Sequence, residues 1–280
     1  MSLITVLPLK KQKNASVKLT PDLLSYWTTL PLFDQIMQTE GMVYRQIEQR
    51  VTLKFTHNDA NFFIKKHHGA AWTDIVKNIF SGRPAILGAK NEYIILKRLA
   101  ELDIKAPIVA GFGASGLNPL NRRSFVITHE IPSAVGMDTL ATQWKSNQLS
   151  WRTKQNLIKK IAEITRALHQ NGVNHRDLYA CHFMITQPLT ENPDVTIMDL
   201  HRAGLRKKTP LRWIRKDLAS LYYSILNFGV TQRDILRFMA YYANKPWVDE
   251  LKDRSEYWFA VKKKAKHFIR RHHKFFDTPL

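Results

Sequence analysis

The chain has 280 residues, of which 44% are hydrophobic, and its 43 Lys and Arg against 23 Asp and Glu give a formal net charge of +20. Length and apolar content suit a globular protein of one large domain or two lobes. The single cysteine, Cys181, excludes an intramolecular disulfide, and the lack of a run of about 18 uncharged apolar residues argues against a transmembrane helix. The charge predicts attraction to polyanions, without choosing among nucleic acid, anionic lipid, phosphorylated glycolipid and acidic protein.

The N-terminal sequence MSLITVLPLKKQKN does not have the order of a signal peptide. Pro8 breaks its short apolar stretch, and its basic residues follow that stretch instead of preceding it. We therefore expect the protein in the cytoplasm. Residues 1–42 are assigned to an N-terminal extension.

Residues 43–131 are expected to form a small nucleotide-binding lobe rich in β-structure. VTLKF alternates apolar and polar side chains, and the turn-forming THNDAN leads from it into FFIKK, so the three together predict a hairpin. Apolar residues recur at three- and four-residue steps through residues 86–102, as in a helix. APIVAGFGASG and SFVITHEI complete the lobe as two strands.

Residues 132–280 are expected to form a larger, mainly α lobe. Three helices are predicted, over residues 151–172 with Gly172 at the end, 217–229, and 231–243 with Thr231 as the N-cap. The basic run EYWFAVKKKAKHFIRRHHKFF has the pattern of an amphipathic helix that either packs on this lobe or lies on a membrane surface. The fold class is therefore α+β.

The run VNHRDLYACHFMI, residues 173–185, gathers polar and reactive side chains between hydrophobic segments. A zinc site is discounted, because Cys181 and His182 are adjacent and the chain has no second cysteine. A cysteine nucleophile is disfavoured, because Cys181 lies in a run of alternating apolar residues, typical of a small buried side chain. The third hypothesis is the catalytic loop of a phosphotransferase.

Kinase chemistry requires an Asp that accepts the proton of the acceptor hydroxyl, a metal ligand five residues later, and a second Asp after a strand pair. Asp177, His182 and Asp199 occur in this order. A kinase also needs a strand lysine for the nucleotide phosphates, held by a carboxylate of the next helix. Lys65 at the end of FFIK and Glu92 in the first turn of the predicted helix supply both, so the parts occur in the required order.

At these residues the chain resembles the lipopolysaccharide core heptose(I) kinases of Gram-negative bacteria, relatives of the protein-kinase fold. The likeness runs from about Tyr44 to Tyr242 and is carried by KNIFSGRPAILGAKNE, GLNPLNRRSFVIT, GVNHRDLYACHF, MDLHRAGLR, RWIRKDLASLYYS and GVTQRDILRFM. It implies a two-lobed, protein-kinase-like fold. It also implies transfer of the γ-phosphate of ATP to the first heptose of the inner core, on the inner face of the inner membrane.

The resemblance implies Asp177 as catalytic base, Lys65 as the phosphate-binding lysine, Glu92 as its ion-pair partner and Asp199 as the main Mg²⁺ ligand. Each role has a physical reason. The base must deprotonate a sugar hydroxyl at the moment of attack, and the metal must neutralise the charge that develops on the phosphates.

Further candidate positions accompany these four residues. His182 stands where kinases place an Asn, and either ligates metal or contacts phosphate; His175 is expected to hold the loop backbone by hydrogen bonds. The backbone near Glu130 and Ile131 is expected to contact adenine, a placement taken from the fold. RQIEQRVTLKF has no glycine-rich phosphate loop, so Arg50 is a candidate for that contact. Arg83 either binds substrate phosphates or caps a helix.

The acceptor implied by the resemblance, lipid A with inner-core sugars, is a polyanion in a membrane, which suits a strongly basic protein. Acyl carrier protein is a further candidate partner. Nucleic acid is not expected, because no recognition motif accompanies the charge. The alternatives are a kinase of another inner-core sugar, Kdo or the second heptose, and a catalytically silent kinase-like scaffold.

Overall fold

The computed structural model describes residues 7–8, 15–27, 31–47, 49–69, 88–116 and 122–276, with the side chains of the last helix up to residue 270. The chain divides into two compact units, Met1–Leu102 with Pro107–Glu130, and Asp103–Ala106 with Ile131–Leu280. Among the helices of the described ranges, none has the length and apolar character needed to cross a membrane. Arg83 lies outside the described residues.

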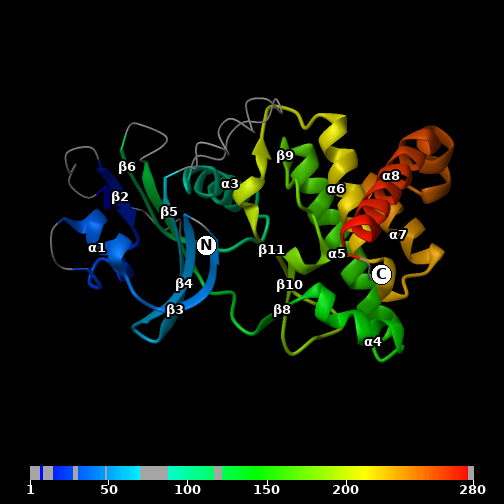
Figure 1. Ribbon diagram of the computed structural model, residues 1–280. Helices are drawn as coiled ribbons and strands as arrows, with labels where there is room; N and C mark the ends of the chain where they lie inside the picture. Colours follow the sequence, from blue (N-terminus) through cyan, green and yellow to red (C-terminus); the bar gives the residue numbers. More distant parts are fainter. Residues whose placement is uncertain are drawn as a thin grey trace. The chain divides into compact units, whose positions relative to one another are not determined.

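The first unit is built on an antiparallel sheet of seven strands within the described residues, in the order β1-β2-β6-β7-β5-β4-β3 (Figure 1). Its strands are β1 (Leu7–Pro8), β2 (Ala15–Leu19), β3 (Met42–Ile47), β4 (Arg50–His57), β5 (Ala60–His68), β6 (Val109–Ser115) and β7 (Arg123–His129). Its helices are η1 (Pro21–Leu23), α1 (Leu32–Gln38) and α3 (Lys90–Glu101).

The hairpin of β4 and β5 turns at Asn58 and Asp59, whose φ angles of 49° and 59° are left-handed. A two-residue turn between twisted strands needs two such residues in succession, and Asn and Asp adopt this conformation more readily than other side chains. His57 pairs with Ala60 next to the turn, and the ladder continues along both strands. The hairpin expected from VTLKF and FFIKK is confirmed.

Helix α3 confirms the helix expected from the spacing of apolar residues. Ile95 and Leu99 are buried on its inner face, and Tyr93 stacks on Phe112 of β6 with ring centroids 4.2 Å apart. This packing fixes the first turn of α3, and with it Glu92, against the sheet.

Strand β2 lies in the part of the chain assigned to an N-terminal extension. It pairs antiparallel with β6, from Leu19 opposite Gly111 to Ala15 opposite Ser115, and Leu19 is fully buried. A side chain at Gly111 would collide with Leu19 and Ile127, so the glycine permits this close approach. The segment is therefore an integral part of the sheet and its core.

The second unit is mainly helical. Its helices are η2 (Met137–Leu140), α4 (Ala141–Lys145), α5 (Trp151–Gln170), η3 (Ala180–His182), η4 (Leu200–Arg202), α6 (Leu211–Ser224), η5 (Leu226–Phe228), α7 (Gln232–Ala243) and α8 (Trp247–Phe276). Short strands form two small sheets, β11-β10-β8 and β12-β9 (Figure 1). These strands are β8 (Ala134–Gly136), β9 (Val173–Asn174), β10 (Phe183–Thr186), β11 (Val195–Ile197) and β12 (Gly204–Leu205).

The ends of the helices follow the sequence signals. Thr231 caps α7 in a capping box with Asp234, as predicted. Gly172 follows α5 with a left-handed φ of 79°, and its α-carbon passes so close to the carbonyl of Arg206 that no side chain fits. This approach holds β9, which leads into the run VNHRD, beside β12.

The basic C-terminal run forms most of α8, a helix with non-helical backbone at Arg254. Tyr257, Val261 and Ala265 are buried and belong to one core cluster with Leu218 of α6 and Tyr242 of α7. The amphipathic helix is thus confirmed, and its apolar face packs on its own unit.

Candidate active site

The loop Val173–Ile185 is held by one buried carboxylate, that of Asp217 in α6. Asp217 has no exposed surface and accepts the backbone N–H groups of His175 at 2.6 Å and Arg176 at 2.8 Å. Arg176 has a left-handed φ of 73°, a strained conformation for a residue with a side chain. Two hydrogen bonds to a charged acceptor stabilise this loop conformation.

The carboxylate of Asp217 is itself supported from a third element. His169 of α5 lies with Nε2 3.4 Å from Asp217 Oδ2, and its Nδ1 is 2.8 Å from the hydroxyl oxygen of Tyr242 in α7. Burial raises the pKa of Tyr242, so its hydroxyl stays protonated. We call Asp217, His169 and Tyr242 the loop anchor.

His175 fastens the loop to the end of β11. Its Nε2 is 2.9 Å from the carbonyl oxygen of Met198, which can only accept, so Nε2 is the protonated nitrogen. Burial lowers the pKa of His175 and favours the neutral ring. The expected structural role of His175 is confirmed by this contact, which holds the loop next to Asp199.

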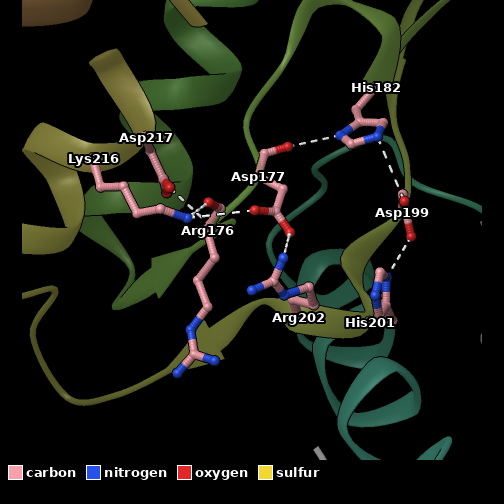
Figure 2. Close-up of polar contacts among 8 residues, drawn as sticks. All are labelled: Arg176, Asp177, His182, Asp199, His201, Arg202, Lys216 and Asp217. Atoms are coloured by element: carbon pink, nitrogen blue, oxygen red, sulfur yellow. Dashed lines mark hydrogen bonds and ion pairs between the residues drawn. The ribbon is translucent and has the colours of Figure 1, made fainter. Parts of the chain in front are cut away.

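Asp177 lies between two cations (Figure 2). Arg202 Nη1 donates to Asp177 Oδ2 at 2.7 Å, and Lys216 Nζ is 3.4 Å from Oδ1. Lys216 also donates to the backbone carbonyl of Arg176, and its burial lowers its pKa although Asp177 and Asp217 oppose the shift. The side chain of Arg176 extends away from this group (Figure 2).

Asp199 follows β11 in a left-handed conformation, φ 58°, with a histidine at each carboxylate oxygen. His201 Nδ1 is 2.5 Å from Oδ1, and His182 Nε2 is 3.5 Å from Oδ2. His182 Nδ1 lies 2.7 Å from the backbone carbonyl of Asp177 and must donate to it. Nε2 is therefore the ring nitrogen that faces Asp199 (Figure 2).

This arrangement suits a cation held jointly with phosphate. Nε2 of His182 and Oδ2 of Asp199 lie 3.5 Å apart, so a ring nitrogen and a carboxylate oxygen, both common metal ligands, face one another. Mg²⁺ in phosphotransferases is held by one or two carboxylates together with water and substrate phosphates. Among the described residues no group of three or more His, Cys, Asp or Glu could hold a metal on its own. The donor set fits a metal that nucleotide phosphates help to bind.

Lys65 and Glu92 are brought together within the first unit. Lys65 Nζ donates to Glu92 Oε1 at 2.5 Å, and Glu92 is nearly buried while a quarter of the Lys65 side chain is exposed. The second oxygen, Glu92 Oε2, is buried and accepts no hydrogen bond from a described residue. The strand-and-helix placement expected for this pair is found.

Glu130 and Ile131 stand where the chain passes from one unit to the other. The side chain of Glu130 accepts from Lys54 and Asn61, and the Lys54 hydrogen bond lowers the pKa of Glu130. Its backbone N–H donates to the carbonyl of Asn61. An adenine contact at this position would therefore use the carbonyl of Glu130 or the backbone of Ile131.

Several residues of the site were not assigned from the sequence: Arg202, Lys216, Asp217 and His201. The signal for Asp217 was an acid in a helix whose following residues are apolar, a pattern that places a carboxylate in the interior. Cys181 is exposed, so the expectation of a small buried side chain is wrong. Desolvation of the thiol by the surrounding chain, together with the charge of Asp138, still raises the pKa of Cys181, which argues against a nucleophile.

Asp177, His182 and Asp199 lie together in the second unit. A comparison with family models adds evidence of a different kind. Residues 34–242 match the model of the lipopolysaccharide kinase (Kdo/WaaP) family. The chain belongs to this family. This confirms the family resemblance and, with the structural likeness below, the protein-kinase-like α+β fold.

Two curated relatives and one solved structure are similar to this chain over most of its length. Lipopolysaccharide core heptose(I) kinase WaaP of Escherichia coli K12 is 39% identical over 233 residues, 82% of this chain and 88% of the relative. The protein of the same name from Pseudomonas aeruginosa PAO1 is 33% identical over 254 residues, 90% of this chain and 95% of the relative. A structure described as WaaP in complex with acyl carrier protein is 30% identical with a TM-score of 0.77, covering 90% of this chain and 98% of that one.

Proposed function

We propose that the protein is an ATP-dependent kinase that phosphorylates the first heptose of the lipopolysaccharide inner core. The observation that carries this proposal is the match, at 33–39% identity over most of the chain, to relatives named lipopolysaccharide core heptose(I) kinase. The arrangement of Asp177 and Asp199 in the second unit, and of Lys65 with Glu92 in the first, supports the same chemistry.

Asp177 is assigned as the base. A sugar hydroxyl attacks the γ-phosphorus of ATP, a new O–P bond forms, the bond to ADP breaks, and the hydroxyl proton passes to a carboxylate oxygen of Asp177. The loop anchor holds Asp177 in place through the backbone of the two preceding residues. Lys65, oriented by the buried Glu92, binds nucleotide phosphates.

Asp199 and His182 would hold Mg²⁺ together with the nucleotide phosphates. When bound, the metal would neutralise charge on the transferring phosphoryl group. His201 contributes by fixing the carboxylate of Asp199, to which Nδ1 must donate, since a carboxylate only accepts. Lipopolysaccharide with its lipid A and inner-core sugars is the acceptor in this proposal.

The test is transfer of labelled γ-phosphate from ATP and Mg²⁺ to heptose-containing lipopolysaccharide that lacks this phosphate, with wild type beside Asp177→Ala. We expect label on the first heptose with wild type only, located by mass spectrometry of the core oligosaccharide. Label on Kdo or on the second heptose would show that this sugar, and not the first heptose, is the acceptor. Nucleotide binding without any transfer would favour the silent scaffold.

We propose acyl carrier protein as a binding partner, because a solved relative is described in complex with it and this chain is strongly basic. The second unit also contains a cavity of about 260 Å³ with an apolar lining, which includes Trp144, Ile161, Leu221, Leu236, Met239 and Trp258. A carrier with an acyl chain combines an acidic surface with an apolar group, and both features of this unit suit it.

Purification through high salt tests the partner. We expect an acidic, acylated carrier protein to remain with the wild type and to be lost from Leu236→Trp, whose larger ring narrows the cavity from a half-buried position. Arg233→Gln, an exposed change on the same helix, is the control. Elution of the wild-type protein without a bound carrier protein would contradict the proposal.

We propose that the protein works in the cytoplasm, at the inner face of the inner membrane. On α8, Phe259 is 69% exposed and shares its face with the exposed side chains of Lys263, Lys266 and Arg270. An exposed aromatic ring among cations is typical of a surface that binds anionic lipid. Flotation with phosphatidylglycerol vesicles, and its loss with phosphatidylcholine vesicles, tests this role.

A further inference from the structure

Both carboxylate oxygens of Asp177 face a cation. Arg202 contacts Oδ2 at 2.7 Å, within ideal hydrogen-bond distance, and Lys216 lies 3.4 Å from Oδ1. The carboxylate is only 17% exposed. An acceptor hydroxyl must come within hydrogen-bond distance of one of these oxygens to give up its proton, so one cation has to yield its position.

Lys216 is the fixed cation of the two. It projects from α6 next to Asp217, donates to the carbonyl of Arg176 as well, and only 24% of its side chain is exposed. Its hydrogen bond to the loop backbone would be lost on any movement, leaving a part-buried carbonyl unpaired.

Arg202 is the movable cation. Its side chain is 42% exposed, and it comes from η4, a three-residue 3-10 helix after Asp199. Figure 2 shows its guanidinium approaching Asp177 from the side opposite His182. Turning the long side chain away exchanges one ion pair for solvent or for another anion, without disturbing a helix.

The sequence between Asp199 and Asp217 is rich in cations. Between Asp199 and Asp217 the sequence has seven Lys and Arg, Arg202 included, and no Asp or Glu: Arg202, Arg206, Lys207, Lys208, Arg212, Arg215 and Lys216. Such a segment has a positive potential that attracts anions. A planar guanidinium is the preferred partner of carboxylate and phosphate, which it binds with two parallel hydrogen bonds.

We propose that Arg202 is an anion-binding residue of the active site. When substrate binds, the guanidinium of Arg202 breaks its ion pair with Asp177 and pairs with a carboxylate or phosphate group of that substrate. The exchange uncovers Oδ2 for the acceptor hydroxyl, so the base becomes available when the anion is in place. This inference rests on the proposed kinase function. The anion belongs either to the acceptor or to the γ-phosphate of the nucleotide, two sources of the same chemistry.

Equilibrium binding separates the two sources without any turnover. The probes are a heptose-containing inner-core oligosaccharide with its carboxylates, the same oligosaccharide after carboxyl reduction, and a non-hydrolysable ATP analogue. The proteins are wild type, Arg202→Gln, Arg202→Lys and Lys207→Gln. Lys207 is an exposed cation of the same segment, so its variant controls for the loss of one positive charge.

For Arg202→Gln we expect at least tenfold weaker binding of one anionic probe, with less than a twofold change for Lys207→Gln and partial recovery in Arg202→Lys. If Arg202→Gln weakens binding of the carboxylated oligosaccharide and not of the reduced one, the acceptor is the source of the anion. If it weakens binding of the ATP analogue, the nucleotide is the source of the anion. The KM of the affected substrate is expected to rise in parallel, whereas a purely structural role would lower kcat with both KM values unchanged.

Arg202→Gln that binds all three probes like wild type would overturn the assignment. Failure of the kinase proposal has a different signature: wild type would bind the probes and transfer no phosphate to heptose, while the dependence on Arg202 would persist.

Discussion

The loop anchor and the group around Asp177 are two regions of one unit that use the same side chain for opposite purposes. Asp217 is fully buried and accepts from backbone N–H groups and a buried histidine. Asp177, 17% exposed, accepts only from the side chains of Arg202 and Lys216 in the described structure. Backbone partners cannot move without unfolding the loop, whereas an exposed side chain such as that of Arg202 can.

The difference teaches how a reactive carboxylate is kept in position and still left accessible. The loop anchor consists of Asp217, His169 and Tyr242 from three helices, and none of these three side chains donates a hydrogen bond to Asp177. The partners of Asp177 are side-chain cations, and one of them, Arg202, is exposed enough to move away. Variants should therefore separate cleanly into those that change activity and those that change stability.

Asp177→Ala should give the largest effect. Loss of the base is expected to lower phosphate transfer by about 10² to 10⁴-fold, while the midpoint of thermal unfolding stays near that of wild type. Transfer assays beside thermal denaturation check this prediction. A fully folded variant with near-normal transfer would show that another group takes the proton.

Asp217→Ala should mainly lower stability. It leaves the N–H groups of His175 and Arg176 buried without an acceptor, at a cost of about 2–5 kcal/mol in the free energy of unfolding. Urea denaturation measures the loss, and Asp217→Asn, which retains one acceptor oxygen, should recover part of it. Equal stability of the alanine variant and wild type would contradict the role of the anchor.

Lys65→Ala and Glu92→Gln extend the comparison to the first unit, where a buried acid again holds a more exposed partner. Lys65→Ala should raise the KM for ATP and lower kcat, by about tenfold or more in kcat/KM, because a charged contact to phosphate is lost. Glu92→Gln should have a smaller effect, since Lys65 keeps its charge and loses its orientation. Steady-state kinetics with both variants decide the order.

His129, a half-buried group of the first unit, should give the smallest effect. Burial lowers its pKa in the folded state, so the unfolded chain binds more protons around the unperturbed value of about 6.5. Stability is then present above that pH and falls as the pH drops through it. Denaturation at pH 7.5 and 5.5 should show a smaller difference for His129→Gln than for wild type.

Much of the fold could be predicted from the sequence, because local rules and tertiary packing agree there. The β4–β5 hairpin has its turn residues, α3 and α8 have their apolar spacing, and Thr231 has its capping partner. Strand β2 had no such signal. Its five residues are defined by pairing with β6, almost a hundred positions away, and long-range pairing leaves no local pattern.

The site residues that could be predicted from the sequence are those whose spacing along the chain is fixed by kinase chemistry. Asp177, His182 and Asp199 follow such a spacing, and the structure brings them together in one unit. Arg202 and Lys216 lie in a run of cations in which no position stands out. Only the fold selects which of these side chains reaches Asp177.

The pairing of β2 with β6 also limits how the protein can be shortened. A fragment that starts at residue 34, where the family match begins, lacks β2 and η1 and with them the buried Leu19 and Leu23. Its β6 would present an open strand edge beside an uncovered apolar face, the arrangement that leads to aggregation. The beginning of the family match is therefore not the beginning of the folding unit, and production of a soluble fragment has to start before Ala15.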